Sequence, residues 1–171
     1  MIERFKQHAG VKEILLSDVG YMQGMSGNGL TTEKGNENSW IDISVMAVPA
    51  NFFSFMNILM EQGRLPQTEK DIVVDNVWQE MQKKDVIGMN LYSGNTDYTI
   101  CGISTPFQAD VYNRSSGYAF LPYNSSVYIG HCYIKSHPGQ QKEVAQWIEK
   151  VCHEMLPENI TYQAKTFLDD I

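Results

Sequence analysis

The first clear pattern in the chain is a change in the spacing of its hydrophobic residues, from a period of two to a helical period. Over residues 41–47 apolar side chains alternate with polar ones, which is the period of a half-buried strand, and Pro49 ends the run. Over residues 52–59 the apolar side chains recur at helical spacing, and Gly63 is a typical helix terminator. The pattern predicts a strand, a proline break and an aromatic helix that runs to Gly63.

The middle of the chain predicts short strands separated by turns and one further helix. Residues 72–74 form a continuous apolar run, typical of a short buried strand, and apolar residues within 77–81 share one helical face. The Ser-Gly-Asn sequence at 93–95 is a turn signal between the apolar residues at 91–92 and the run at 98–103. These residues predict a strand, a helix and a β-hairpin.

The two ends of the chain predict αβ elements of their own. Residues 2–9 have helical spacing and are followed by Gly10, and residues 11–16 are rich in strand formers. Near the other end the pattern predicts a strand, a helix and a second strand, over residues 127–135, 140–156 and 160–167. We therefore expect an α+β fold in which the middle of the chain is inserted between an N-terminal αβ unit and a C-terminal βαβ-like unit, with both chain ends on one side.

Two stretches lack such periodicity. Residues 20–39 hold five glycines and few large apolar side chains, which predicts a loop or a weak hairpin. Residues 106–118 predict an exposed crossing. Neither stretch indicates a phosphate-binding loop, because the glycines lack a preceding buried strand, a following helix and a suitably placed lysine.

Composition limits the classes of function. The 171 residues suffice for one or two small domains with a proper core, and the formal charge of −7 with thinly spread basic residues argues against nucleic-acid binding. The chain lacks an apolar run of about 18 residues, the length that a membrane helix needs. Its first residues also lack the apolar core of a secretion signal, so we expect either a cytosolic protein or a segment whose upstream sequence is missing.

Candidate reactive side chains are few and poorly spaced. The candidates are His131, Cys132, His137, Cys152 and His153. Neighbours on a strand point to opposite faces, and neighbours on a helix diverge by about 100°, so we expect structural or surface roles for all five. The three cysteines allow one disulfide, but their spacing indicates neither a disulfide framework nor a zinc motif, and Cys132 and Cys152 have the setting of buried packing thiols. We predict no enzyme activity, no metal site and no cofactor; a thiol-dependent hydrolase using Cys132 is the weakest alternative.

The order and spacing of four motifs resemble the periplasmic core domain of MacB-type ABC transporter permeases, a group that includes FtsX-like and lipoprotein-releasing permeases. These motifs are the aromatic segment 51–64 with its Gly-Arg ending, the strand 72–76, Ile87-Gly88 and the run 98–103. The chain departs from the family pattern at Asp75-Asn76, at Leu65 and near Thr105. The resemblance covers nearly all of the chain.

The resemblance implies a split, membrane-proximal porter-like subdomain of ferredoxin-like character, residues 1–48 and 118–171, with an inserted sabre-like subdomain at 49–117. It implies a domain on the periplasmic face of the bacterial inner membrane that transmits ATP-driven motion in export or in lipoprotein or peptide transport. The implied partners are the protein's own transmembrane helices, a cytoplasmic ATP-binding domain or subunit, a second permease copy, and a periplasmic adaptor or lipoprotein.

Six residues are candidates for contact with a partner: Phe52, Phe53, Phe55, Tyr112, Arg114 and Tyr118. Three phenylalanines crowd one predicted helix so tightly that not all of them can face the same core. Plain packing is the preferred interpretation, and the alternative is that one of them meets a partner or the other subdomain, since exposed aromatic residues are common at interfaces. The alternative to a permease domain is a free-standing secreted binding or adhesion module that uses these same segments.

Overall fold

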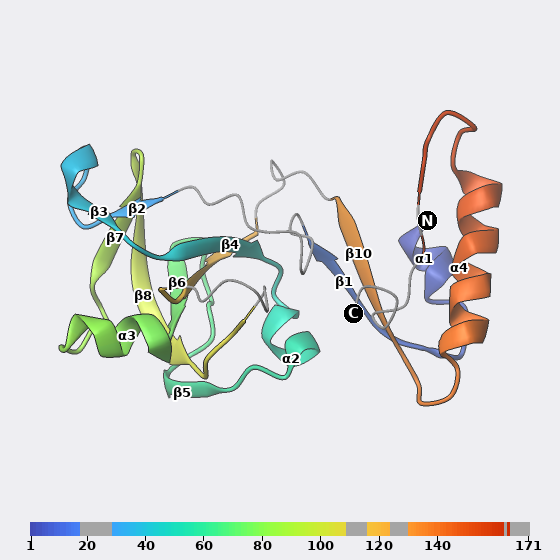
Figure 1. Cartoon of the computed structure of the whole chain (residues 1–171), viewed down its shortest axis with the longest axis horizontal. Coiled ribbons are helices and arrows are strands. Elements are labelled where there is room, and N and C mark those ends of the chain that lie inside the picture. Colours follow the sequence, from blue (N-terminus) through green and yellow to red (C-terminus); the bar gives the residue numbers. More distant parts are fainter. Residues whose placement is uncertain (18–28, 109–115, 124–129, 163, 165–171) are drawn as a thin grey trace. The chain divides into compact units, whose positions relative to one another are not determined.

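Residues 1–17, 29–108, 116–123, 130–162 and 164 are described by a computed structural model. The chain divides into two units (Figure 1). The terminal unit combines Met1–Leu15 with Cys132–Ile171, and the sheet unit is Leu16–His131. Both units mix helices and strands, so the predicted α+β class is confirmed.

Eight strands form one mixed sheet in the sheet unit. Their order is β3-β2-β7-β8-β6-β9-β4, and β5 pairs in addition with β8. The strands are β2 (Leu30–Thr31), β3 (Trp40–Ile41), β4 (Ser44–Val48), β5 (Met60–Gly63), β6 (Asp71–Asp75), β7 (Asn90–Ser93), β8 (Thr96–Ser104) and β9 (Tyr118–Pro122). Two of the pairs, β4 with β9 and β6 with β8, are parallel.

Strand β8 organises this sheet because three strands pair with it. Strand β7 pairs with its first half, from Asn90 opposite Thr99 to Ser93 opposite Thr96, and β5 pairs with its second half. Strand β6 runs parallel to β8 along the other edge, and every residue of β6 is buried. The hairpin between β7 and β8 turns at Gly94, whose φ of +57° suits the first central position of a tight two-residue turn.

The aromatic helix is shorter than its sequence spacing predicts. Helix α2 spans Phe52–Met56 and ends at Asn57, which has a left-handed φ of +55°. The Ile58 N–H donates to the Phe53 carbonyl at 2.9 Å and the Asn57 N–H to the Ser54 carbonyl at 3.3 Å, the two bonds of a Schellman cap. The predicted continuation to Gly63 is therefore wrong, because Met60–Gly63 pairs with β8 as strand β5.

Helix α3 follows β6 directly and covers the sheet. It spans Asn76–Gln82, and the Asp75 side chain caps its start by accepting a hydrogen bond from the Trp78 N–H at 3.1 Å. Trp78 is 1% exposed and packs in a core of aliphatic residues from six strands of the sheet. The predicted strand, helix and hairpin of this region are confirmed.

The terminal unit is built from both parts of the chain that it contains. Strands β1 (Val11–Ser17) and β10 (His131–Ser136) form a two-stranded sheet, and the helices are α1 (Ile2–Phe5) and α4 (Gln141–Met155). Val144, Ile148, Val151 and Cys152 line the buried face of α4 and form one core with Phe5. Val11 and Ile14 of β1 and Ile134 of β10 pack against this core. Within the described residues, no helix is both long and apolar enough to cross a membrane.

Several predicted boundaries differ in the structure. The first helix has four residues rather than eight, and residues 160–162 of the predicted last strand are not in a strand. The predicted strand 41–47 is split into β3 and β4, because β3 pairs with β2 whereas β4 pairs with β9. The pairing of β2 with β3 realises the hairpin alternative for the end of the glycine-rich stretch, whose residues 18–28 lie outside the described residues.

The contact-based division of the chain also differs from the predicted subdomain boundaries. The structure divides between Leu15 and Leu16 and between His131 and Cys132, whereas the predicted boundaries at 48/49 and 117/118 fall inside the sheet unit. The reason is that β9 pairs with β4 on one side and with β6 on the other, so these segments belong to one sheet.

Candidate functional site

The predicted partner-contact residues in the described part of the chain lie in an aromatic core. Phe52, Phe53 and Phe55 are 1%, 4% and 6% exposed, and Tyr118 is 3% exposed. The ring centroids of Phe52 and Phe53 both lie 5.4 Å from that of Phe120, so the rings pack against one another. A partner contact through these side chains would require the core to open. Tyr112 and Arg114 lie outside the described residues.

A hollow of about 340 Å³ lies at the edge of this aromatic core. Its lining includes Asp75, Phe107, Gly117 and Tyr118. Asp75 is completely buried at the start of α3. Burial is the largest influence on the pKa of its carboxyl group and raises that pKa. The backbone N–H groups of Trp78, Tyr118 and Phe107 oppose this rise in pKa. The arrangement is a helix cap held in a largely apolar wall.

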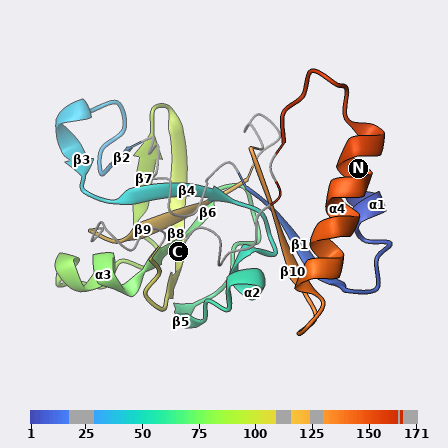
Figure 2. The same cartoon turned by 45° about the vertical axis from the view of Figure 1, so that its right-hand side comes forward.

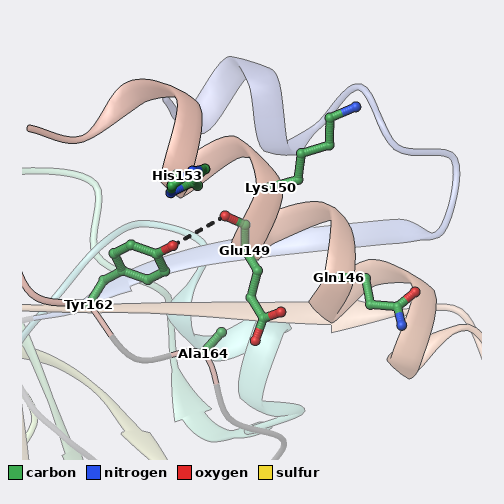
Figure 3. Close-up of a pocket in the computed structure, with 6 residues that line it drawn as sticks. All are labelled: Gln146, Glu149, Lys150, His153, Tyr162 and Ala164. Atoms are coloured by element: carbon green, nitrogen blue, oxygen red, sulfur yellow. Dashed lines mark hydrogen bonds between the residues drawn. The ribbon is translucent and has the colours of Figure 1, made fainter. Parts of the chain in front are cut away.

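A second hollow, of about 560 Å³, lies along α4 in the terminal unit (Figure 3). Its lining is polar and is formed by Gln146, Glu149, Lys150, His153, Tyr162 and Ala164. The Tyr162 hydroxyl donates to the backbone carbonyl of Glu149 at 3.4 Å, which ties the segment after α4 back to the helix. The side chains offer hydrogen bonds and mixed charge to a polar group.

The sulfur chemistry does not favour catalysis. Desolvation, together with the nearby Cys152 thiol, raises the pKa of Cys132 to about 11, and burial raises the pKa of Cys101 and Cys152. Thiols of this kind are protonated near neutral pH, whereas the thiolate is the nucleophile. Cys152 is buried as expected, but Cys132 is exposed, so the expectation that Cys132 is a buried packing residue is wrong. In the described ranges, no three His, Cys, Asp or Glu side chains are grouped as metal ligands would be.

The Gly-Arg motif has a structural explanation that its sequence does not reveal. The Arg64 guanidinium donates two hydrogen bonds to Asp71, at 2.7 and 3.0 Å, and the N–H groups of Gln67 and Thr68 donate to Asp71 Oδ2 at 2.8 and 3.0 Å. The hydrogen bonds from Arg64 are the largest cause of a pKa for Asp71 that lies well below the ordinary range. This network fastens the link between β5 and β6, and the sequence signal was the acidic residue that precedes the apolar run at 72–74.

In the terminal unit, the N-terminal helix is held directly on the last helix. Arg4 forms an ion pair with Glu154 at 2.8 Å, and the Trp147 indole N–H donates to the Arg4 carbonyl at 3.3 Å. The Arg4 guanidinium carbon lies 5.9 Å from the centre of the Trp147 ring, within cation–π range. A charged pair and an aromatic contact therefore join residues that are almost the whole chain apart in sequence.

These features define a class of protein: a domain in which segments from both sides of a large mixed sheet in the sequence build one unit, and the residues between them build a second unit that contains the sheet. No protein-family model and no curated protein matches the sequence. Solved structures do match it. A domain of a protein described as a permease, from Porphyromonas gingivalis, superposes with a TM-score of 0.66 at 12% identity, covering 92% of this chain and 70% of that one.

Two further structures are named as parts of ABC-type transporters. The extracellular domain of the noncanonic ABC-type transporter YknZ from Gram-positive bacteria has a TM-score of 0.64 at 12% identity, covering 90% of this chain and 81% of that one. The periplasmic region of MacB from Actinobacillus actinomycetemcomitans has a TM-score of 0.60 at 14% identity, covering 94% and 84%. The chain has the fold of MacB-like periplasmic domains.

Proposed function

We propose that this chain is the extracytoplasmic domain of an ABC-type permease, at the periplasmic face of the bacterial inner membrane, and that it performs no bond chemistry. In this proposal the domain passes ATP-driven motion from the membrane to cargo or to a periplasmic adaptor or lipoprotein. The likeness to extracellular and periplasmic domains of ABC-type transporters supports the kind of protein.

The observation that carries the proposal is that two distant segments of the chain build the terminal unit together. Its two-stranded sheet takes β1 from the beginning of the chain and β10 from its last quarter, and its helices α1 and α4 come from the same two segments. A domain inserted between two membrane helices needs such a unit, because both connections must return to one membrane surface. The sheet unit is then the part available for cargo or partners.

The contact between α1 and α4 gives the proposal a mechanical route. A movement of the segment that carries Arg4 reaches α4 through the Arg4–Glu154 ion pair and through Trp147. Packed elements of this kind shift as nearly rigid bodies between discrete arrangements. The ATP-binding domain or subunit and a second permease copy are the further partners that the proposal requires.

Topology mapping on the full-length protein tests the location. Reporter fusions placed in residues 33–38 and 65–70, which are mostly exposed, are expected to be active as alkaline phosphatase and inactive as β-galactosidase. The opposite pattern would place the domain in the cytoplasm and end the proposal.

Hydrogen exchange on the full-length transporter tests the mechanical role. We expect protection of α4 to change between the nucleotide-free and the ATP-bound, vanadate-trapped states. The change should be lost in Trp147→Ala and retained in Trp40→Ala, whose side chain is 55% exposed in the sheet unit. An α4 whose protection ignores nucleotide in the unmodified protein would contradict the proposal.

A further inference from the structure

Two cysteines of the terminal unit lie on facing surfaces of a strand and a helix. Side chains alternate along a strand, so Cys132 and Ile134 of β10 belong to the same face. Ile134 packs against the core formed by α4, and Cys152 belongs to that core with an exposure of 6%. Side-chain alternation therefore assigns Cys132 to the face of β10 that meets α4, where Cys132 is exposed and Cys152 is buried.

The two cysteines also lie at the same level along that interface. Helix α4 follows β10 through a short turn and runs back in the opposite direction, which Figures 1 and 2 both show. Cys132 lies four residues before the end of β10, about 13 Å at 3.3 Å per residue, and Cys152 lies eleven residues into α4, about 16 Å at 1.5 Å per residue. The short turn between the two elements brings both positions to matching heights.

The electrostatics of the thiols agree with this placement. The Cys152 thiol contributes to the raised pKa of Cys132, so the two groups lie close enough to interact. Both thiols are free in the structure, and Cys132 is the exposed member of the pair. A reagent can therefore reach Cys132 first, with Cys152 behind it.

We propose that Cys132 and Cys152 form a disulfide that fastens α4 to β10 in the mature protein. The proposal rests on the proposed function only for its compartment, because extracytoplasmic spaces are oxidising and let disulfides persist. Cys101, which lies in the sheet unit and whose sulfur contacts the Arg64 carbonyl at 3.4 Å, has no part in the bond.

The chemistry is thiol–disulfide exchange with a protein or small-molecule disulfide as oxidant. With oxidised glutathione, the Cys132 thiolate attacks one glutathione sulfur, and the first glutathione leaves as a thiolate. The Cys152 thiolate then attacks the Cys132 sulfur, forms the protein disulfide and releases the second glutathione. The two protons of the protein thiols end on the two glutathiones, and two electrons pass from the protein to the oxidant.

Thiol counting on the whole chain tests the proposal. The folded, reduced protein is incubated with excess oxidised glutathione at pH 8, quenched with acid, and labelled with a maleimide in denaturant. We expect labelled thiols to fall from three to one, with a peptide linking Cys132 to Cys152. The reaction rate should rise about tenfold per pH unit between pH 7 and 9, because the thiols are protonated in this range.

The cysteine variants provide matched controls. Cys101→Ser should still lose both of its remaining thiols, whereas Cys132→Ser and Cys152→Ser should form no intramolecular bond. The oxidised protein should also unfold at a higher urea concentration than the reduced protein. Three reactive thiols after prolonged oxidation, a lasting glutathione adduct on Cys132, or a bond to Cys101 would overturn the proposal.

A measurement in cells separates this proposal from the proposed function. The full-length protein is trapped with acid and alkylated directly from growing cells. An oxidised pair supports both proposals. A reduced pair in cells, combined with ready oxidation of the purified chain, contradicts both the disulfide in the mature protein and the extracytoplasmic location. A pair that is reduced in cells and also resists oxidation in the purified chain overturns the disulfide alone, and the topology mapping then decides the location.

Discussion

Substituting Gly117 by alanine should destabilise the sheet unit much more than an ordinary glycine substitution. Gly117 has a φ of +106°, and a Cβ atom built there would lie 2.5 Å from the Cβ of Trp78 and 2.6 Å from the Oδ1 atom of Asp75. Contacts this short oblige the backbone before β9 to move away from the start of α3. Both groups that it meets are buried, so neither has room to give way.

The magnitude follows from two separate costs. An alanine in a sparsely populated backbone region costs about 1–3 kcal/mol. Forcing extra volume into a packed core costs about 1–3 kcal/mol more. Gly94→Ala is the matched control, because Gly94 also has a positive φ but nothing lies within 4 Å of its Cβ position. Gly117→Ala should therefore be about 1–3 kcal/mol less stable than Gly94→Ala.

Urea unfolding provides the assay. With tryptophan retained only at Trp78, in a Trp40→Phe and Trp147→Phe background, fluorescence reports on the core next to Gly117. For a slope of about 2 kcal/mol per molar urea, the midpoint of Gly117→Ala should lie roughly 0.5–1.5 M below that of Gly94→Ala. Equal midpoints would show that Gly117 does not approach the start of α3 this closely.

Four other substitutions have expected outcomes that differ in sign or size. Arg64 and its neighbours lower the pKa of Asp71, so the stabilisation by the Asp71 carboxylate is complete above its unperturbed pKa of 3.8 and is lost as the pH falls below that value. In urea titrations, Asp71→Asn should therefore lower the free energy of unfolding more at pH 7 than at pH 3. Burial raises the pKa of Asp75, so its charge lowers stability as the pH rises above 3.8. Asp75→Asn keeps a capping oxygen and should gain stability relative to the unmodified chain between pH 4 and pH 7; no gain over this range would show that burial does not penalise the charge. Trp147→Ala should cost about 1–3 kcal/mol, because it removes a half-buried ring and the hydrogen bond to the Arg4 carbonyl. Arg4→Ala should cost at most about 1 kcal/mol, because the Arg4–Glu154 ion pair is partly exposed, and thermal denaturation in which Arg4→Ala is the less stable variant would refute this ranking.

The elements that could be predicted from the sequence are those that pack against or pair with adjacent segments of the chain. The apolar run at 72–74, the helix after it and the hairpin turning at Gly94 each follow from local spacing, and each is present. The length of α2 could not be predicted in the same way. Asn57 was its only local stop signal, and the apolar spacing continues to Leu59, which lies between α2 and β5 and is 68% exposed.

The buried polar residues and the pairing partners could not be predicted from sequence. Asp71 and Asp75 stand at the ends of an apolar run, where exposed carboxylates are the usual expectation, and only their partners at Arg64 and Trp78 explain their burial. The subdomain boundaries depend on the pairing of β4 with β9, which joins segments about 70 residues apart and leaves no local signal. The aromatic candidates Phe52 and Phe53 lie in the core because they pack against Phe120 of β9, a contact between distant segments that also leaves no local signal.

The discontinuous terminal unit has a consequence for the order in which the protein is made. Its α1 and β1 are synthesised before their partners β10 and α4, which follow only after the whole of Leu16–His131. The sheet unit can complete its hydrogen bonding while the leading segment still waits, with its apolar side chains uncovered. Until β10 and α4 have been synthesised, a chaperone or a nearby lipid surface has to shield the apolar side chains of residues 1–15.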